Sequence, residues 1–145
     1  MTAEVPTLRE VLTATVTIGA MVKLGTGPGG ERRLIPILGG HFTGPRLRGR
    51  VLPGVDRQLI ATPDLKLLDA VYELETDDGV VLTVRNRVKV ISAAQPSPRP
   101  LSHADVAAPF GAYAWLNRAV LVGRLTPPEG GTAAVVVELF ELCDG

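Results

Sequence analysis

The stretch LLDAVYELETDDGVVLTVRNRVKVI, residues 67–91, decides the fold, because it contains two strand-like halves around a turn signal. Apolar residues recur at every second position on both sides of Asp77-Asp78-Gly79. A three-residue loop with Gly79 in the left-handed region matches apolar with apolar side chains across the hairpin. A two-residue turn would place Glu73 opposite Val84 and mix a charged face with a buried one. We therefore predict the three-residue loop.

This register fixes which side chains of the hairpin face inwards. Leu74 then meets Leu82, Tyr72 meets Val84 and Ala70 meets Asn86, while the charged side chains fall on the opposite, solvent-facing side. The Asn86 amide is the exception on the apolar face, where an unpartnered polar group costs about 1–3 kcal/mol. We expect this amide to be available to a bound molecule.

The rest of the chain consists of short alternating or apolar runs separated by glycine and proline. Only residues 92–110, which contain four prolines, lack such a pattern. We expect that segment to be either a mobile linker or a lid over a site. Further strands are expected at residues 8–18, 32–42, 47–52, 58–60, 113–124 and 132–142.

About eight antiparallel runs, with no convincing amphipathic helix to cover a sheet, favour closure into a barrel, because closure removes exposed strand edges. We predict an all-β fold: a single closed antiparallel β-barrel of about eight or more strands with little helix, forming one domain over residues 1–145. Barrels of this size either fill with side chains or hold one small ligand. The inward side chains expected here are mostly small, which favours a ligand cavity.

Charge and motif content narrow the classes of partner. Fifteen Lys and Arg balance fifteen Asp and Glu, so no positive field favours a nucleic acid or a membrane partner. The N-terminus lacks a secretory pattern, and we expect a cytoplasmic protein. Two histidines and the single Cys143 lack metal-ligand or redox spacing, so we expect neither a metal nor another cofactor. The G-x-G-x-x-G match at residues 25–30 precedes a strand pattern rather than a helix and indicates a hairpin turn.

Two residues are candidates for moving a proton. Asp56 follows a Pro-Gly pair near a strand end, from which it could point into the mouth of a barrel; the alternative is a turn residue bonded to backbone amides. His41 adjoins Gly39-Gly40, where missing side chains would leave room for a ligand beside an imidazole that titrates near neutrality; the alternative is a structural or surface histidine. No nucleophile motif of the G-x-S-x-G type is present, which disfavours covalent acyl transfer.

Polar-tipped side chains on apolar faces are the candidates for binding a substrate. Tyr113, Trp115 and Asn117 share one face of the strand expected at residues 113–124, which suits either core packing or the orientation of a carbonyl-bearing ligand. Tyr72 and Asn86 lie on the inward face of the central hairpin. The expected substrate-binding set is therefore Tyr72, Asn86, Tyr113, Trp115 and Asn117.

Several sequence blocks, in the right order, resemble a known family. Residues 36–45, PILGGHFTGP, and 47–54, LRGRVLPG, resemble the signature PITGG-x-F-x-GP-x-L-x-G-x-VLPGG of the domain-of-unknown-function family numbered 3237. Residues 68–72, 76–79 and 113–118 resemble its LDARY, T-x-DG and Y-x-WLN blocks, and Asn86 resembles the Asn of its following strand. The resemblance implies a closed antiparallel barrel that is commonly self-associated, so we expect a homodimer. It implies no established general activity.

The chain departs from this family pattern in three of its blocks. The family's GGADW reads Gly54-Val55-Asp56-Arg57 here, so the second Gly and the Trp are absent while Asp56 remains. Val71 replaces the Arg of LDARY, and only Pro109-Phe110 remains of the FRT-P segment. The loss of Arg and Trp suggests an altered and more aliphatic ligand.

The leading hypothesis is a cofactor-independent enzyme of the cyclase, isomerase or lyase type, acting on an apolar, carbonyl-containing and polyketide-like metabolite inside the barrel. The substrate-binding set would hold a carbonyl or developing enolate and shape the chain, and Asp56 or His41 would move a proton. Two alternatives stay open: a non-catalytic binder of hydrophobic metabolites and a purely structural dimerising barrel.

Overall fold

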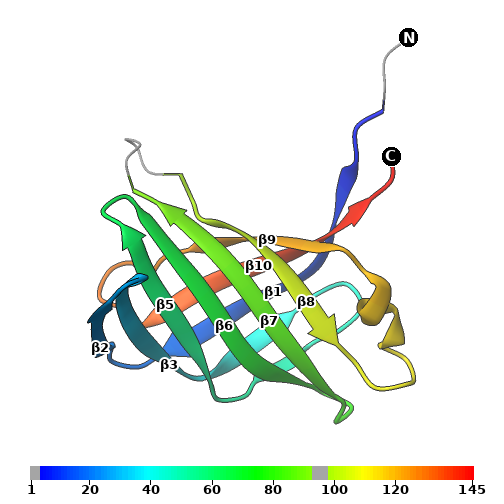
Figure 1. Ribbon diagram of the computed structural model, residues 1–145. Helices are drawn as coiled ribbons and strands as arrows, with labels where there is room; N and C mark the ends of the chain where they lie inside the picture. Colours follow the sequence, from blue (N-terminus) through cyan, green and yellow to red (C-terminus); the bar gives the residue numbers. More distant parts are fainter. Residues whose placement is uncertain (1–3, 93–97) are drawn as a thin grey trace.

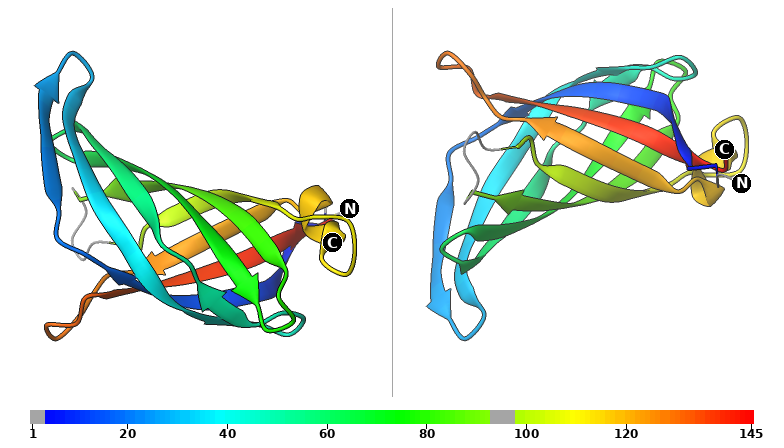
Figure 2. Two further views of the ribbon diagram at one scale, coloured as in Figure 1. Left: turned by 90° about the horizontal axis from the view of Figure 1, so that it is seen from below. Right: turned by 90° about the horizontal axis from the view of Figure 1, so that it is seen from above.

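The computed structural model describes residues 4–92 and 98–145, which form a closed antiparallel β-barrel (Figures 1 and 2). The ring closes where β1 (Thr7–Ile18) pairs with both β10 (Ala134–Cys143) and β3 (Gly30–Thr43). The barrel has eight strands and two extra ones, and the all-β fold class expected from the sequence is confirmed. The other elements are β2 (Val22–Gly27), β4 (Gly49–Val51), β5 (Gly54–Thr62), β6 (Leu65–Thr76), β7 (Val81–Ile91), β8 (Leu101–Ala107), the 3₁₀ helix η1 (Ala114–Arg118) and β9 (Leu121–Thr126).

The β6–β7 hairpin has the register that the sequence predicts. Leu74 pairs with Leu82, Tyr72 with Val84 and Ala70 with Asn86. Gly79 has a φ of +85°, in the left-handed region, and the Thr76 backbone N–H donates to the Val80 carbonyl at 2.9 Å. The three-residue loop is therefore confirmed, and with it the assignment of the even-numbered side chains of both strands to the interior.

The barrel is filled at one end and hollow at the other. Leu116 of η1 is 2% exposed and packs into a core that includes Phe42, Leu74 and Leu82. The Tyr113 hydroxyl, just before η1, donates to Asp78 in the β6–β7 turn at 2.8 Å, which places η1 at the turn end of the hairpin. The same end carries the described parts of both termini (Figure 1). The opposite end is left for a cavity.

The strand expected at residues 113–124 is wrong in its first half. Residues 114–118 form the 3₁₀ helix η1, and β9 begins only at Leu121. The Asn117 side chain fixes this turn, since its Oδ1 accepts from the Ala108 N–H at 2.8 Å and its Nδ2 donates to the Ala108 carbonyl at 2.9 Å. This local bonding competes with extension into a strand.

The expectation of an unpatterned segment at residues 92–110 is wrong for its second half. β8 (Leu101–Ala107) is part of the barrel wall between β7 and β9. Its inward residues Ala104 and Val106 are small, and they weaken the apolar signal that would have predicted a strand. Of the linker or lid suggested there, residues 93–97 lie outside the described residues. The short strand β2 was also missed, although the glycine-rich turn at residues 25–30 is the hairpin turn that the sequence indicated.

A substitution at Gly79 tests the turn that sets the hairpin register. We expect Gly79→Ala to lower the free energy of unfolding by about 1–2 kcal/mol, because a Cβ is strained at this positive φ. Urea denaturation followed by circular dichroism would measure the change. Gly29→Ala is the matched control, since a Cβ there meets nothing within 4 Å. Equal stability of the two variants would contradict the assignment.

Candidate functional site

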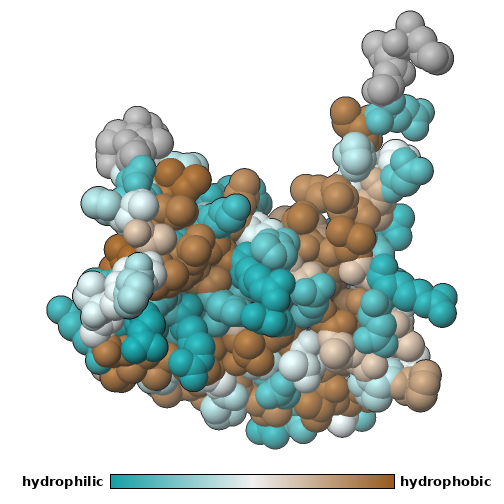
Figure 3. Space-filling model, in the orientation of Figure 1, coloured by the Kyte–Doolittle hydropathy of each residue, from teal (hydrophilic) through white to brown (hydrophobic). Residues whose placement is uncertain are grey.

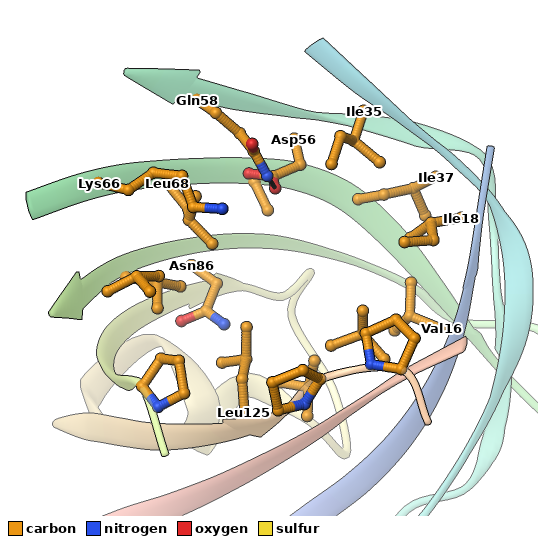
Figure 4. A pocket seen from close by; sticks show the side chains of 18 of the residues that line it. Val16, Ile18, Ile35, Ile37, Asp56, Gln58, Lys66, Leu68, Asn86 and Leu125 are labelled. Atoms are coloured by element: carbon orange, nitrogen blue, oxygen red, sulfur yellow. Dashed lines mark hydrogen bonds between the residues drawn. The ribbon is translucent and has the colours of Figure 1, made fainter. Parts of the chain in front are cut away.

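A cavity of about 230 Å³ occupies the barrel at the end away from η1. Its volume is roughly that of eight water molecules in the liquid, which corresponds to a small organic molecule. The wall is mostly aliphatic, with residues such as Val16, Ile37, Leu68 and Val88. Five polar side chains interrupt this apolar wall: Tyr72, and the four labelled in Figure 4, which are Asp56, Gln58, Lys66 and Asn86.

Strand register brings two of these polar groups onto one interior row. Asp56 of β5 pairs with Ala70 of β6, and Ala70 pairs with Asn86 of β7. Neighbouring strands lie about 4.8 Å apart, so the backbones of Asp56 and Asn86 are roughly 10 Å apart across the row. The methyl group of Ala70 leaves the space between the two polar side chains open. A ligand lying over Ala70 would therefore contact a carboxyl on one side and an amide on the other.

Asp56 is the acid of this row, and its surroundings shift the pKa of its carboxyl. Its Oδ2 accepts a hydrogen bond from Gln58 Nε2 at 2.9 Å, while its Oδ1 is buried and has no partner among the described residues. Burial raises the pKa of the Asp56 carboxyl to about 6, against the opposing effects of the Gln58 hydrogen bond and the positive charge of Lys66. This carboxyl therefore exchanges a proton near neutral pH, as an acid–base group must.

The neighbouring polar groups remain neutral donors and acceptors. Asn86 is 2% exposed, and its Oδ1 has no hydrogen-bond partner in the described part of the chain. Tyr72 is 3% exposed. Burial, followed by the nearby charge of Asp56, raises the pKa of the Tyr72 hydroxyl, which therefore stays protonated. Both side chains offer hydrogen bonds to a ligand without adding charge.

Lys66 and Gln58 belong to the cavity but were not predicted from the sequence. The Lys66 side chain extends into the cavity near Asp56 and Gln58 (Figure 4). The even-numbered face of the hairpin, continued from Ala70 back to Lys66, would have identified the lysine. The alternation that turns Asp56 inwards also turns Gln58 inwards. Both signals were present in the sequence.

His41 lies outside the barrel and away from the cavity. It is exposed on β3, where the next residue, Phe42, is buried. Alternation along the strand makes the two side chains point to opposite faces. Gly40, expected to leave room for a ligand, instead allows close approach of β1, because a Cβ there would overlap the Thr15 carbonyl oxygen. Asp56 and His41 are therefore not brought together.

The structure also separates Tyr113, Trp115 and Asn117 from Tyr72 and Asn86. Tyr113 bonds Asp78 at the closed end of the barrel, and the Arg46 guanidinium lies 4.0 Å from the centre of the Trp115 ring. Asn117 is bonded to the Ala108 backbone. These three residues fix η1 over the end of the core, and none of them lines the cavity.

Two further features of the described residues bear on partners. Across residues 4–92 and 98–145, no three His, Cys, Asp or Glu side chains gather as a metal site would require. No helix in the same ranges is long and apolar enough to cross a membrane.

The fold and its interior chamber define a class of small closed β-barrels with a cavity lined by a few polar groups. Within that class, the chain belongs to the family described as Protein of unknown function (DUF3237), whose model matches residues 6–142. The family resemblance seen in the sequence blocks is therefore confirmed.

Individual relatives agree with this assignment. A UPF0311 protein of Rhodopseudomonas palustris (strain TIE-1) is 46% identical over 84 residues, which cover 56% of this chain and 55% of the relative. The chain thus spans about half the length of the curated relatives it matches. The crystal structure of a conserved protein of unknown function from Rhodopseudomonas palustris is 29% identical, with a TM-score of 0.86, over 96% of this chain and 99% of that one. A crystal structure of an enzyme from Penicillium herquei shares the fold, with a TM-score of 0.77 at 21% identity over 98% of both chains.

The raised pKa of Asp56 predicts a pH-dependent stability. Because the folded state binds the proton more tightly than the unfolded state, the buried carboxyl destabilises the fold progressively as pH rises from about 4 to about 6, and fully above that. We expect Asp56→Asn to raise the free energy of unfolding at pH 7.5 by up to about 3 kcal/mol and to change it little below pH 4. Urea denaturation at both pH values would measure this. The exposed Asp105→Asn is the control, and a stability gain that does not depend on pH would contradict the prediction.

Proposed function

We propose that this protein is a cofactor-independent enzyme that moves a proton on an apolar carbonyl compound held in the barrel, as a cyclase, isomerase or lyase. The observation that carries the proposal is a buried carboxyl with a pKa near 6 that faces the Asn86 amide across an aliphatic cavity; among the described residues, neither Asp56 Oδ1 nor Asn86 Oδ1 has a hydrogen-bond partner. A purely structural interior would be expected to satisfy or replace such groups.

The proton transfer assigns a role to each polar side chain. Asp56 Oδ1, in the carboxylate form, takes a proton from the carbon next to a substrate carbonyl, and the electrons of the C–H bond move onto the carbonyl oxygen to form an enolate. The Tyr72 hydroxyl and the Asn86 amide N–H donate to that oxygen, and the Lys66 ammonium offsets its charge. Return of the proton to another carbon completes an isomerisation.

Ring closure follows from the same intermediate. The enolate carbon attacks a second carbonyl of the same chain, and the protonated Asp56 gives its proton to the new alkoxide. The cavity wall holds the two reacting ends together, which supplies much of the acceleration available to an intramolecular reaction. A chain with several carbonyls, such as a polyketide-like metabolite, suits this sequence of steps. The fungal neighbour described as an enzyme is consistent with catalysis on this fold.

A carbon-acid exchange assay tests the proposed base. The probe is 2,4-octanedione, whose size suits the cavity and whose C3 carbon, between the two carbonyls, is acidic. We expect the protein to accelerate deuterium incorporation at that carbon, followed by proton NMR. The rate should rise with pH through about 6 and then level off as the Asp56 carboxylate forms.

Two variants separate the base from other contributions. We expect Asp56→Asn to reduce the catalysed exchange by about 100-fold or more while the probe still binds. His41→Ala should leave the rate unchanged, because His41 points away from the cavity. Protein-catalysed exchange that survives Asp56→Asn, above the rate without protein, would exclude Asp56 as the base. Binding of the probe without any catalysed exchange would instead favour a carrier of hydrophobic metabolites.

Filling the space over Ala70 tests whether the cavity is the site. We expect Ala70→Leu to abolish the thermal stabilisation by 2,4-octanedione, since the larger side chain would occupy the gap between Asp56 and Asn86. Val71→Leu, at the adjacent outward position, should bind the probe as the parent chain does. If the ligand still stabilises Ala70→Leu, binding occurs elsewhere.

A further inference from the structure

A second hollow, of about 530 Å³, crosses the outer face of β5, β6 and β7. It runs between two outward rows of side chains set by the strand register. One row is Arg32, Leu59, Leu67 and Lys89, and the other is Arg57, Asp69, Arg87 and His103. We call this hollow the outer groove. The floor of the outer groove is the backbone of the middle row, which lies between these two outward rows. The side chains of that middle row face the interior.

The outer groove carries an excess of positive charge. Arg32, Arg57, Arg87 and Lys89 line it, and within the described residues none of these four takes part in an ion pair. Asp69 is the one acid that lines it, and Arg85, from beside the groove, already holds both carboxylate oxygens at 3.0 and 2.8 Å. Arg57 and Arg87 flank Asp69 in their row, so its charge acts on both, but the lining of the groove still holds more cations than acids in a chain with no net charge.

Apolar surface lies among these cations. Leu59 and Leu67 occupy the middle of the first row, between Arg32 and Lys89, and Leu24 of the β2–β3 hairpin also lines the groove. This face of the barrel is turned toward the viewer in Figure 3, where hydrophobic surface is interspersed with strongly hydrophilic side chains. Guanidinium groups pair with two oxygens of a phosphate or carboxylate at once, and the leucines can cover a short hydrocarbon chain.

We propose that the outer groove is a binding site for a small amphiphilic anion, in which a phosphate or carboxylate head contacts Arg57 and Arg87 and a short apolar tail covers Leu59 and Leu67. A second copy of this chain fits less well, because a symmetric contact through this face would bring like charges together. The site is separate from the interior cavity, although Gln58, Leu68 and Val88 line both: their side chains face the cavity, and their backbone forms the floor of the groove.

Titration with hexyl phosphate, followed by calorimetry and backbone amide NMR, tests the proposal. We expect saturable binding with shifts at Arg57, Asp69 and Arg87, weakening as salt is raised. Inorganic phosphate and hexanol should each bind at least about fivefold more weakly, since each lacks one half of the ligand. Equal binding of inorganic phosphate and hexyl phosphate would overturn the amphiphilic assignment.

Charge-neutral variants locate the site. We expect Arg57→Gln/Arg87→Gln to weaken hexyl phosphate binding by about tenfold or more. Arg48→Gln/Arg50→Gln removes the same charge outside the groove, together with surface ion pairs to Asp77 and Glu75, and should change binding by less than about twofold. All four positions are at least partly exposed, so both variants should keep the melting temperature of the parent chain. Equal losses in the two pairs would show a non-specific charge effect and overturn the site.

Two further measurements distinguish other occupants. Vesicles of phosphatidylcholine and phosphatidic acid present the same head group on a surface; binding to these vesicles without binding to soluble hexyl phosphate would overturn the proposal. So would a change of molecular mass in solution for Arg57→Gln/Arg87→Gln with unchanged phosphate binding, because the groove would then be a contact between copies. Unchanged mass together with lost hexyl phosphate binding supports the small-anion site.

Discussion

The pairing register of β6 with β7 is the constraint on which the rest of the structure depends. A shift by one residue would turn every side chain of one strand to the other face, since the side-chain period is two. Gly79 and the Thr76–Val80 backbone bond prevent that shift. The same register places Asn86 inside and Arg87 outside. Both the interior cavity and the outer groove are therefore consequences of one turn.

Inside the barrel, the charge of Asp56 lies where the fold stabilises it poorly. The carboxyl accepts a hydrogen bond from Gln58 and lies near the positive charge of Lys66, but the cost of burial outweighs both. Energetically, a neutral side chain would suit this position better. A group that weakens the fold and also titrates near neutral pH is typical of a site kept for chemistry rather than for stability. Outside, on the same strands, the charges face water and ordinary solvation applies.

Most of the fold could be predicted from the sequence, because alternation over long strands such as β1, β6 and β7 is a strong signal. The failures have local causes. β8 was missed because its inward Ala104 and Val106 are small, and η1 was read as a strand because Asn117 bonds to Ala108, a contact that no periodicity reveals. In β1, the register shifts between Glu10 and Leu12, and Leu8, which lies before this irregularity, is exposed.

The candidate site was predictable only where it lies on the well-patterned hairpin. Tyr72 and Asn86 follow directly from the β6–β7 register, and Asp56 follows from its place near a strand end. His41 could not be excluded without knowing that Phe42 takes the inward position. The aromatic residues around η1 were grouped by an assumed strand, so the helical turn removed the reason for placing them with the cavity.

Three prolines, Pro100, Pro127 and Pro128, form part of the lining of the chamber, while Leu116 blocks its far end. Proline has a fixed φ and no backbone N–H, so this part of the cavity wall is stiff and offers few hydrogen-bond donors to an entering molecule. Entry at this end of the cavity then depends on the width of a molecule more than on its polarity. Among the described residues, Leu116 covers the other end of the core, so a molecule bound in the cavity would enter and leave past these prolines.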